Sequence, residues 1–164
     1  MTGPLPTGGR VVPREWIDYI GHMNDGYYLL AFTAATESFL DQVGLGSAYR
    51  EESGRAMYTV ESHLVFSASA RLGDELRFAT RLLGADAKRL HVLHQMTLGD
   101  GTEAAACELM FLHVDIASGK VVPLPPDRLT AVTALAAAHA AFPAPANAGR
   151  RIAMPAPASR PGGS

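Results

Sequence analysis

The segment Gly26–Val43 places the strongest condition on the fold. It contains no proline, is rich in helix formers and ends before Gly44, so the sequence predicts one helix here. From Gly26 to Thr36 it carries no charged residue, and a helix that is apolar nearly all round is a buried one. Asn24 or Asp25 is placed to cap its first turn. The rest of the chain must therefore cover this helix on most sides.

Four later segments alternate apolar and polar residues with period two, and each is predicted to be a strand. The links between them are short, which implies antiparallel neighbours. We also expect an opening strand near Arg10–Pro13, a polar loop over Gly46–Arg55 and a closing helix over Leu129–Phe142. The strand segments are Tyr58–Ala70, Leu76–Leu83, Arg89–Leu98 and Ala104–Val114, and in the first of them Tyr58, Val60, Leu64, Phe66 and Ala68 are expected to pack inward.

These elements predict an α+β domain in which a curled antiparallel sheet wraps around one long buried helix. The domain is expected to span residues 8–142, followed over residues 143–164 by a tail rich in Pro, Ala and Gly that is largely mobile. Contact of the tail with the domain through Arg150, Arg151, Ile152 and Met154 stays open. Because a small curled sheet has exposed edges, a homodimer, or a tetramer built from two dimers, is expected.

The composition excludes several classes of partner. The chain has 164 residues, of which 48% are hydrophobic and 18% charged, as in a single globular domain. Its net charge of −2 leaves no broad basic surface for nucleic acid or an anionic membrane. No apolar run approaches the length of a membrane span, and the N-terminus lacks the features of a signal peptide. With one cysteine, Cys107, no intramolecular disulfide can form, and a cytoplasmic location is expected.

The densest group of polar and aromatic residues lies in the loop before the long helix, over residues 16–28. Loops held between rigid elements are common places for sites. Asp18 has the chemistry of a nucleophile or of a base that deprotonates water, although a loop residue bonded to nearby amides is an equal interpretation. The backbone amides near Asp25, Gly26 and Tyr27, at the start of the helix, are suited to stabilise an oxyanion.

The pattern Asp18-x-x-Gly21-His22-Met23-Asn24-x-x-Tyr27 resembles the signature D-x-x-G-H-x-N-x-x-Y of hot-dog-fold acyl-CoA thioesterases of the 4-hydroxybenzoyl-CoA thioesterase type. The likeness runs from about Arg10 to Pro155. It implies a hot-dog fold and hydrolysis of an acyl-CoA to a carboxylate and free CoA, with no cofactor. It also implies that Asp18 is the catalytic carboxylate. Four segments look like the thioesterases of carnitine catabolism, which act on betainyl-CoA: TVESHLVF at 59–66, DAKRLHVLHQM at 86–96, ACELMFLHVD at 106–115 and GRRIAMP at 149–155.

Other polar residues near the signature have two interpretations each. Asn24 either orients the water or thioester or caps the helix, and His22 is either a general acid or base or a residue that orders the loop. In the resembling family many members carry Asn or an aromatic residue at the position of Asp25, so a side-chain role there is in doubt. Glu37 lies too far along the helix to share a carbonyl held at its start. Glu61 is a secondary candidate that could pair with His63 or reach a partner subunit's site, and a satisfied edge-strand carboxylate is the alternative interpretation.

Aromatic and basic residues provide the candidates for substrate binding. Ring faces attract a quaternary ammonium, but an aromatic or apolar acyl group would suit the same pocket. The aromatic candidates are Trp16, Tyr19, Tyr27 and Tyr28. Lys88 and Arg89, with Arg71 and Arg77, are candidates for the CoA phosphates, and solvated charges are the alternative interpretation.

Metal and cysteine chemistry are not expected. His91 and His94 are three apart in a predicted strand and so point to opposite faces, which disfavours a shared metal. Cys107 is interpreted as a small core residue rather than a nucleophile. Two rival functions remain at this point, namely a non-catalytic acyl-CoA-binding or regulatory module and an enoyl-CoA hydratase, although the Asp and His motif of the hydratases is missing.

Overall fold

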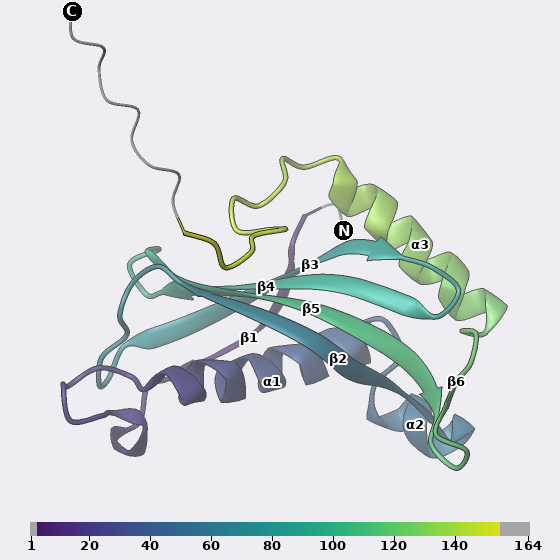
Figure 1. The fold of residues 1–164 in the computed structure, drawn as a ribbon, viewed down its shortest axis with the longest axis horizontal. Helices are drawn as coiled ribbons and strands as arrows, with labels where there is room; N and C mark the ends of the chain where they lie inside the picture. The colour runs from purple at the N-terminus through teal and green to yellow at the C-terminus, as the bar shows by residue number, and fades with distance from the viewer. Residues whose placement is uncertain (1–2, 155–164) are drawn as a thin grey trace, which may run out of the picture.

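The fold is an antiparallel sheet with one long helix against one of its faces. The computed structural model describes residues 3–154. The strand order is β1-β3-β4-β5-β2, with β6 beside β5. Helix α1 lies along one face of the sheet and α3 on the other side (Figure 1). The strands are β1 Leu5–Val11, β2 Arg55–Phe66, β3 Glu75–Ala85, β4 Arg89–Leu98, β5 Glu103–Asp115 and β6 Lys120–Val121, and the α-helices are α1 Asp25–Gln42, α2 Ser47–Ser53 and α3 Pro126–Ala140. The predicted curled sheet around one helix is confirmed.

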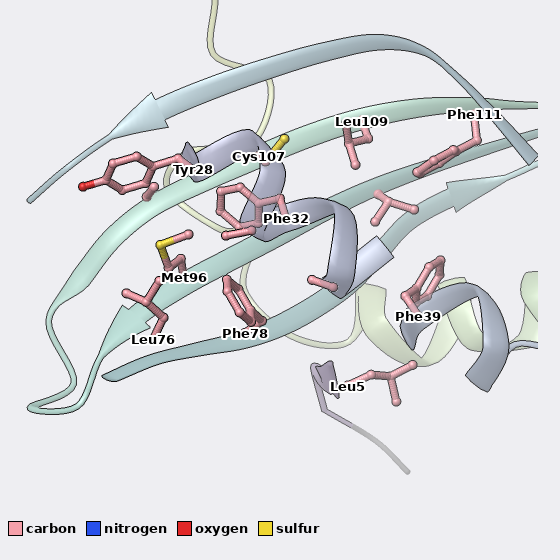
Figure 2. Close-up of a cluster of buried hydrophobic side chains, with 14 of the residues drawn as sticks. Leu5, Tyr28, Phe32, Phe39, Leu76, Phe78, Met96, Cys107, Leu109 and Phe111 are labelled. Carbon is pink, nitrogen blue, oxygen red and sulfur yellow. The ribbon is translucent and has the colours of Figure 1, made fainter. Parts of the chain in front are cut away.

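The core forms where α1 meets the concave face of the sheet. Buried α1 side chains recur at helical spacing, and Figure 2 shows Phe32 and Phe39 among side chains of β3, β4 and β5. Phe32, with 1% of its surface exposed, meets the ring of Phe78 edge to face at 5.9 Å. The prediction of a helix buried nearly all round is wrong at Leu29 and Leu30, which are 45% and 51% exposed because they face away from the sheet.

Strand β2 is an edge of the sheet, and its apolar pattern misled the prediction. A β-bulge shifts the pairing with β5 between Thr59 and Glu61. The bulge moves Tyr58 to the opposite face of the sheet from Leu64 and Phe66. The even-numbered residues of β2 therefore do not all lie on the same face. Tyr58, Val60 and Phe66 are 46%, 54% and 51% exposed instead of packed inward.

Other departures from the prediction lie at the ends of elements. The expected polar loop contains helix α2, whose first amide, that of Ser47, donates to Asp41 Oδ1 at 3.1 Å. Its Tyr49 is buried, with the hydroxyl 2.9 Å from His113 Nε2. Strand β1 begins earlier than expected, at Leu5, which is 3% exposed and belongs to the core. Strand β2 ends at Phe66, which leaves residues 67–70 free to form a loop.

The chain beyond α3 is hydrogen-bonded to the domain as far as Gly149, whereas Ile152 and Met154 are 96% and 91% exposed. The Arg81 guanidinium donates to the carbonyl oxygens of His139 at 2.7 Å and Pro143 at 2.6 Å. The Gly149 amide donates to Glu108 Oε2 at 2.7 Å. Residues 155–164 of the predicted tail lie outside the described residues.

One histidine is enclosed in the core beneath α1. His94 Nε2 lies 2.9 Å from Thr36 Oγ1 and its Nδ1 lies 2.7 Å from Thr80 Oγ1, so both ring nitrogens have partners. Burial lowers the pKa of His94 from 6.5 to about 4, because the charged ring would lose its hydration. His91 instead sits on the outer face, 2.6 Å from Glu108 Oε1, so the prediction of opposite faces is confirmed.

Candidate active site

The loop that carries Asp18 is a tight turn closed by backbone hydrogen bonds. Ile17 and Met23 pair as an isolated antiparallel bridge, and the Asp18 amide donates to the His22 carbonyl at 2.9 Å. The Gly21 amide donates a hydrogen bond to the Asp18 carbonyl oxygen at 3.1 Å. Gly21 has φ +90°, a conformation that side-chain-bearing residues rarely adopt, which is the physical reason for a glycine at this point of the signature.

The carboxylate of Asp18 is oriented through one oxygen only. Oδ1 accepts the Ile20 amide at 2.8 Å and the His22 amide at 3.3 Å. Oδ2 accepts no hydrogen bond from residues 3–154. The Asp18 side chain is half-buried and lines a cavity of about 570 Å³. The loop-residue interpretation and the catalytic one therefore apply to different oxygens of the same group.

The start of α1 forms a second part of this cavity. Asn24 is the N-cap, and its Oδ1 accepts the Gly26 amide at 3.0 Å, so the predicted capping role is confirmed. Asp25 Oδ1 lies 2.9 Å from the same amide. The Tyr27 amide donates to the Asn24 carbonyl at 3.0 Å. Of the three amides predicted for an oxyanion, only that of Asp25 has no acceptor among residues 3–154.

The opposite wall comes from the last residue of β2 and the loop after it, a stretch that was predicted to be strand throughout. Phe66, Ser67, Ala68 and Ser69 line the cavity. Tyr28 joins this wall to α1, since its hydroxyl accepts the Ala70 amide at 2.9 Å and donates to the Ala68 carbonyl at 3.5 Å. The alternating Ser and Ala residues were the available signal for a loop here, because they are weaker strand formers than the residues before them.

The predicted aromatic residues divide into two groups. Tyr19, which is 97% exposed, and the buried Tyr28 line the cavity. Trp16 and Tyr27 stack on each other with ring centroids 5.3 Å apart, and neither belongs to the cavity wall. The guanidinium of Arg10 lies 4.3 Å from the centroid of the Trp16 ring. Trp16 therefore already has a cation of the protein itself as its partner.

Several other candidates lie apart from this cavity. Glu61 lines a separate cavity of about 280 Å³ on the outer sheet face. Lys88 lies in the turn between β3 and β4, and Arg89 is the first residue of β4. The Arg89 guanidinium holds the pKa of Asp86 below its usual range. Glu37 lines a third cavity beside α2. Among residues 3–154, the cavity that Asp18 lines is formed by the signature loop, the start of α1 and residues 66–69.

The single cysteine of the chain, Cys107, is buried in β5. Burial raises the pKa of the Cys107 thiol to about 12, so this residue is not a ready nucleophile. Among residues 3–154 no group of three or more His, Cys, Asp or Glu side chains is arranged to hold a metal ion. No helix in the same range is long and apolar enough to cross a membrane.

Comparison with known proteins identifies the family. Residues 12–138 match the thioesterase-like superfamily. The chain is 40% identical, over 94% of its own length and 98% of the other's, to a betainyl-CoA thioesterase of Pseudomonas aeruginosa. It is 37% identical to an L-carnitine dehydrogenase/betainyl-CoA thioesterase of Rhizobium meliloti, spanning 92% of this chain but 30% of that protein.

Solved structures of thioesterases have the same fold as this chain. A putative thioesterase of Pseudomonas putida superimposes with a TM-score of 0.78 at 34% identity, covering 93% of this chain and 98% of the other. A Staphylococcus aureus protein solved in complex with CoA gives a TM-score of 0.84 at 25% identity, covering 94% and 99%. The fold is thus that of the hot-dog thioesterases, and the chain is a thioester hydrolase. The chain belongs to the thioesterase-like superfamily, as the signature around Asp18 predicted.

Proposed function

We propose that this enzyme hydrolyses betainyl-CoA to betaine and free CoA, with Asp18 as its catalytic carboxylate. The observation that carries the proposal is that Asp18, whose Oδ2 accepts no hydrogen bond from residues 3–154, lines the same cavity as Asp25, whose amide has no acceptor in that range. A thioester carbonyl bound between them would have an electrophilic carbon near the carboxylate and an oxygen near a donor. Relatives named as betainyl-CoA thioesterases support the acyl group.

In this mechanism Asp18 either deprotonates a water molecule that attacks the thioester carbon, or attacks that carbon itself to form an anhydride that water then hydrolyses. In both routes the carbon–sulfur bond breaks and CoA leaves as the thiolate, which takes up a proton that the water has given up. Both routes need a free carboxylate oxygen held in a fixed direction, and the amides on Oδ1 provide that. The Asp25 amide, at the positive end of the helix dipole, stabilises the negative charge that develops on the carbonyl oxygen. Asn24 holds the helix start, and the half-buried His22 forms part of the wall.

The charge of the cavity supports a cationic acyl group. Two carboxylates, those of Asp18 and Asp25, line it, whereas no Lys or Arg does. Tyr19 and Phe66 add exposed ring surface to the same wall, which suits a trimethylammonium group. A negatively charged acyl group would meet two like charges there.

The test is thiol release from acyl-CoA substrates by the wild type and by Asp18→Asn. The panel contains betainyl-CoA, short and medium straight-chain acyl-CoAs and an aromatic acyl-CoA. We expect release from betainyl-CoA and a loss of about a thousandfold or more in kcat for Asp18→Asn, with CoA binding retained. Near-normal turnover by Asp18→Asn would contradict its role. Release only from other thioesters would contradict the acyl group, and binding without any release would favour a non-catalytic module.

We further propose that the protein is a homodimer. Strand β2 leaves one side of the sheet unpaired, and apolar side chains are exposed on it and on the adjacent helix. These exposed side chains are Leu29, Leu30, Tyr58, Val60 and Phe66. Because Phe66 also lines the cavity, a second copy on this edge would reach the site. Sedimentation equilibrium should give a dimer for the wild type and a shift toward monomer for Val60→Lys, and a monomeric wild type would contradict the proposal.

In such a dimer Lys88, Arg89 and Glu61 would act on the partner's cavity, since they lie apart from the cavity of their own chain. The proposed role of Lys88 and Arg89 is contact with the CoA phosphates. A rise in KM with an unchanged kcat in Lys88→Ala would support it, and an unchanged KM would contradict it. A cytoplasmic location is also proposed, in keeping with a single buried, unpaired cysteine.

A further inference from the structure

Asp25 contributes two different groups to the same point of the active-site cavity. Its amide has no acceptor among residues 3–154, and Asp25 is one of the two acidic residues that line the cavity. The Gly26 amide, 2.9 Å from Asp25 Oδ1, holds the carboxylate back against the helix start instead of leaving it extended into solvent. A fixed negative charge therefore stands beside the donor proposed for the carbonyl oxygen.

This neighbourhood is unfavourable for an ordinary acyl group. During the reaction the carbonyl oxygen becomes negative, and a carboxylate a few ångströms away raises the free energy of that state. An acidic residue in the first turn stabilises the helix through the helix dipole. That effect does not depend on the position of the active site, so it does not offset the cost to catalysis. A carboxylate at this position is a disadvantage to catalysis unless the substrate brings a compensating positive charge.

A betainyl thioester brings that charge to the right place. One methylene separates its ammonium nitrogen from its carbonyl carbon, the same connectivity as N–Cα–C=O in a peptide, so nitrogen and oxygen lie roughly 3–4 Å apart. When the oxygen accepts the Asp25 amide, the trimethylammonium group is confined to the immediate surroundings of that amide. The Asp25 carboxylate is in those surroundings as well.

No other group of the cavity is as well placed to take the cation. The one other carboxylate on its wall, Asp18, is required at the carbonyl carbon. The Trp16 ring is outside the wall and already contacts the Arg10 guanidinium. Tyr19 projects into solvent with 97% of its surface exposed, so it gives ring surface but no fixed charge.

We propose that Asp25 is the residue that selects a cationic acyl group, through contact of its carboxylate with a quaternary ammonium one methylene away from the thioester carbonyl. This inference rests on the proposed function, because it assumes that Asp18 and the Asp25 amide hold the thioester. It assigns Asp25 a specificity role that is separate from the main-chain role of the same residue.

The experiment compares two substrates that differ in one atom. Betainyl-CoA and 3,3-dimethylbutanoyl-CoA have the same shape, but a neutral carbon replaces the charged nitrogen in the second. The measured quantity is the ratio of the two kcat/KM values, for the wild type, Asp25→Asn and Asp25→Glu. Asp25→Asn keeps the amide and the size of the side chain, whereas Asp25→Glu keeps the charge.

The matched control is Asp127→Asn. Asp127 is also an acidic residue in the first turn of a helix, α3, and it is exposed and outside the cavity. Its substitution removes the same formal charge and the same favourable contact with a helix dipole. Any effect common to both variants is thus an effect of net charge or of helix stability.

We expect the wild type to prefer betainyl-CoA and Asp25→Asn to reduce that preference about tenfold or more. Asp25→Glu should keep most of the preference, and Asp127→Asn should keep all of it. An equal decrease for both substrates in Asp25→Asn, or a wild type that does not distinguish the two, would overturn the assignment of Asp25 while leaving the thioesterase proposal standing. A wild type that releases no thiol from betainyl-CoA would overturn the proposed function itself, and this inference with it.

Discussion

Mild acid should weaken this fold through one buried residue, His94. In the unfolded chain His94 titrates near 6.5, whereas burial lowers its pKa to about 4 in the folded chain. Between these values the unfolded state binds a proton that the folded state does not, so the free energy of unfolding decreases as the pH falls. The gap corresponds to about 3 kcal/mol below pH 4, of which about 2 kcal/mol is already lost between pH 7 and pH 5.

The assay is urea unfolding at pH 7, 6 and 5, at constant ionic strength and protein concentration. Fluorescence of Trp16 reports the transition, because this single tryptophan is 4% exposed in the folded state. The comparison variant, His94→Gln, keeps hydrogen-bonding groups near Thr36 and Thr80 but cannot titrate. We expect it to be less stable than the wild type at pH 7 and to lose about 2 kcal/mol less on going to pH 5.

The comparison isolates His94 because the other histidines are common to both proteins. Burial also lowers the pKa of His139, for example, and its contribution cancels in the difference. Equal losses in the wild type and in His94→Gln would refute the reasoning. If the variant fails to fold, NMR titration of the His94 ring in the folded wild type tests the same reasoning. A titration midpoint near 6.5 would contradict the effect of burial on the pKa of His94.

Four further substitutions, of which Gly101→Ala is a control, test the loop, the wall and the chain beyond α3. Gly21 and Gly101 have nearly equal φ angles, +90° and +89°, and an added Cβ at either position would have no neighbour within 4 Å. Gly21→Ala and Gly101→Ala should therefore each lower the free energy of unfolding in urea by about 1–2 kcal/mol, whereas only Gly21→Ala should lower kcat. Equal kcat values for the two variants would contradict the role of the turn in orienting the Asp18 carboxylate. Tyr28→Phe should lose about 1 kcal/mol of stability and some turnover, because the Ala70 amide loses its acceptor, and unchanged values of both would contradict this. Arg81→Met should lower the free energy of unfolding by about 2–4 kcal/mol in the same assay, because three carbonyl oxygens lose a charged hydrogen-bond donor. A decrease below about 1 kcal/mol would contradict this and show that water replaces the guanidinium as the donor.

The order of most elements could be predicted because its signals are local, and the residues of the candidate site could be picked out for the same reason. The absence of charge from Gly26 to Thr36 indicated a helix against a sheet, and Asp18 through Tyr27 lie in one short stretch. Two features depended on contacts that a sequence pattern does not show. The bulge at Val60 reversed the faces of β2, and Asp41 supplied the first hydrogen bond of α2 from a different helix.

The aromatic residues illustrate the same limit within the site. Four rings near one signature suggested a binding cage, yet composition cannot indicate which rings already have partners. Trp16 and Tyr27 stack together, and Arg10 from β1 lies over the face of Trp16. Residues 66–69 were missed as a wall because the prediction extended β2 to Ala70.

The turn around Asp18 has a consequence for how such enzymes can diverge. Its backbone is fastened by main-chain bonds, from the Met23 amide to the Ala70 carbonyl and from the Asn24 amide to the Trp16 carbonyl. The side chains at the tip of the turn, Tyr19 and Ile20, are 97% and 63% exposed and take no part in these main-chain hydrogen bonds. Duplicated genes could therefore change acyl preference by substitutions at positions 19 and 20, with little effect on the position of the carboxylate. Selection for a new substrate and selection for folding would then act on different residues of one short loop.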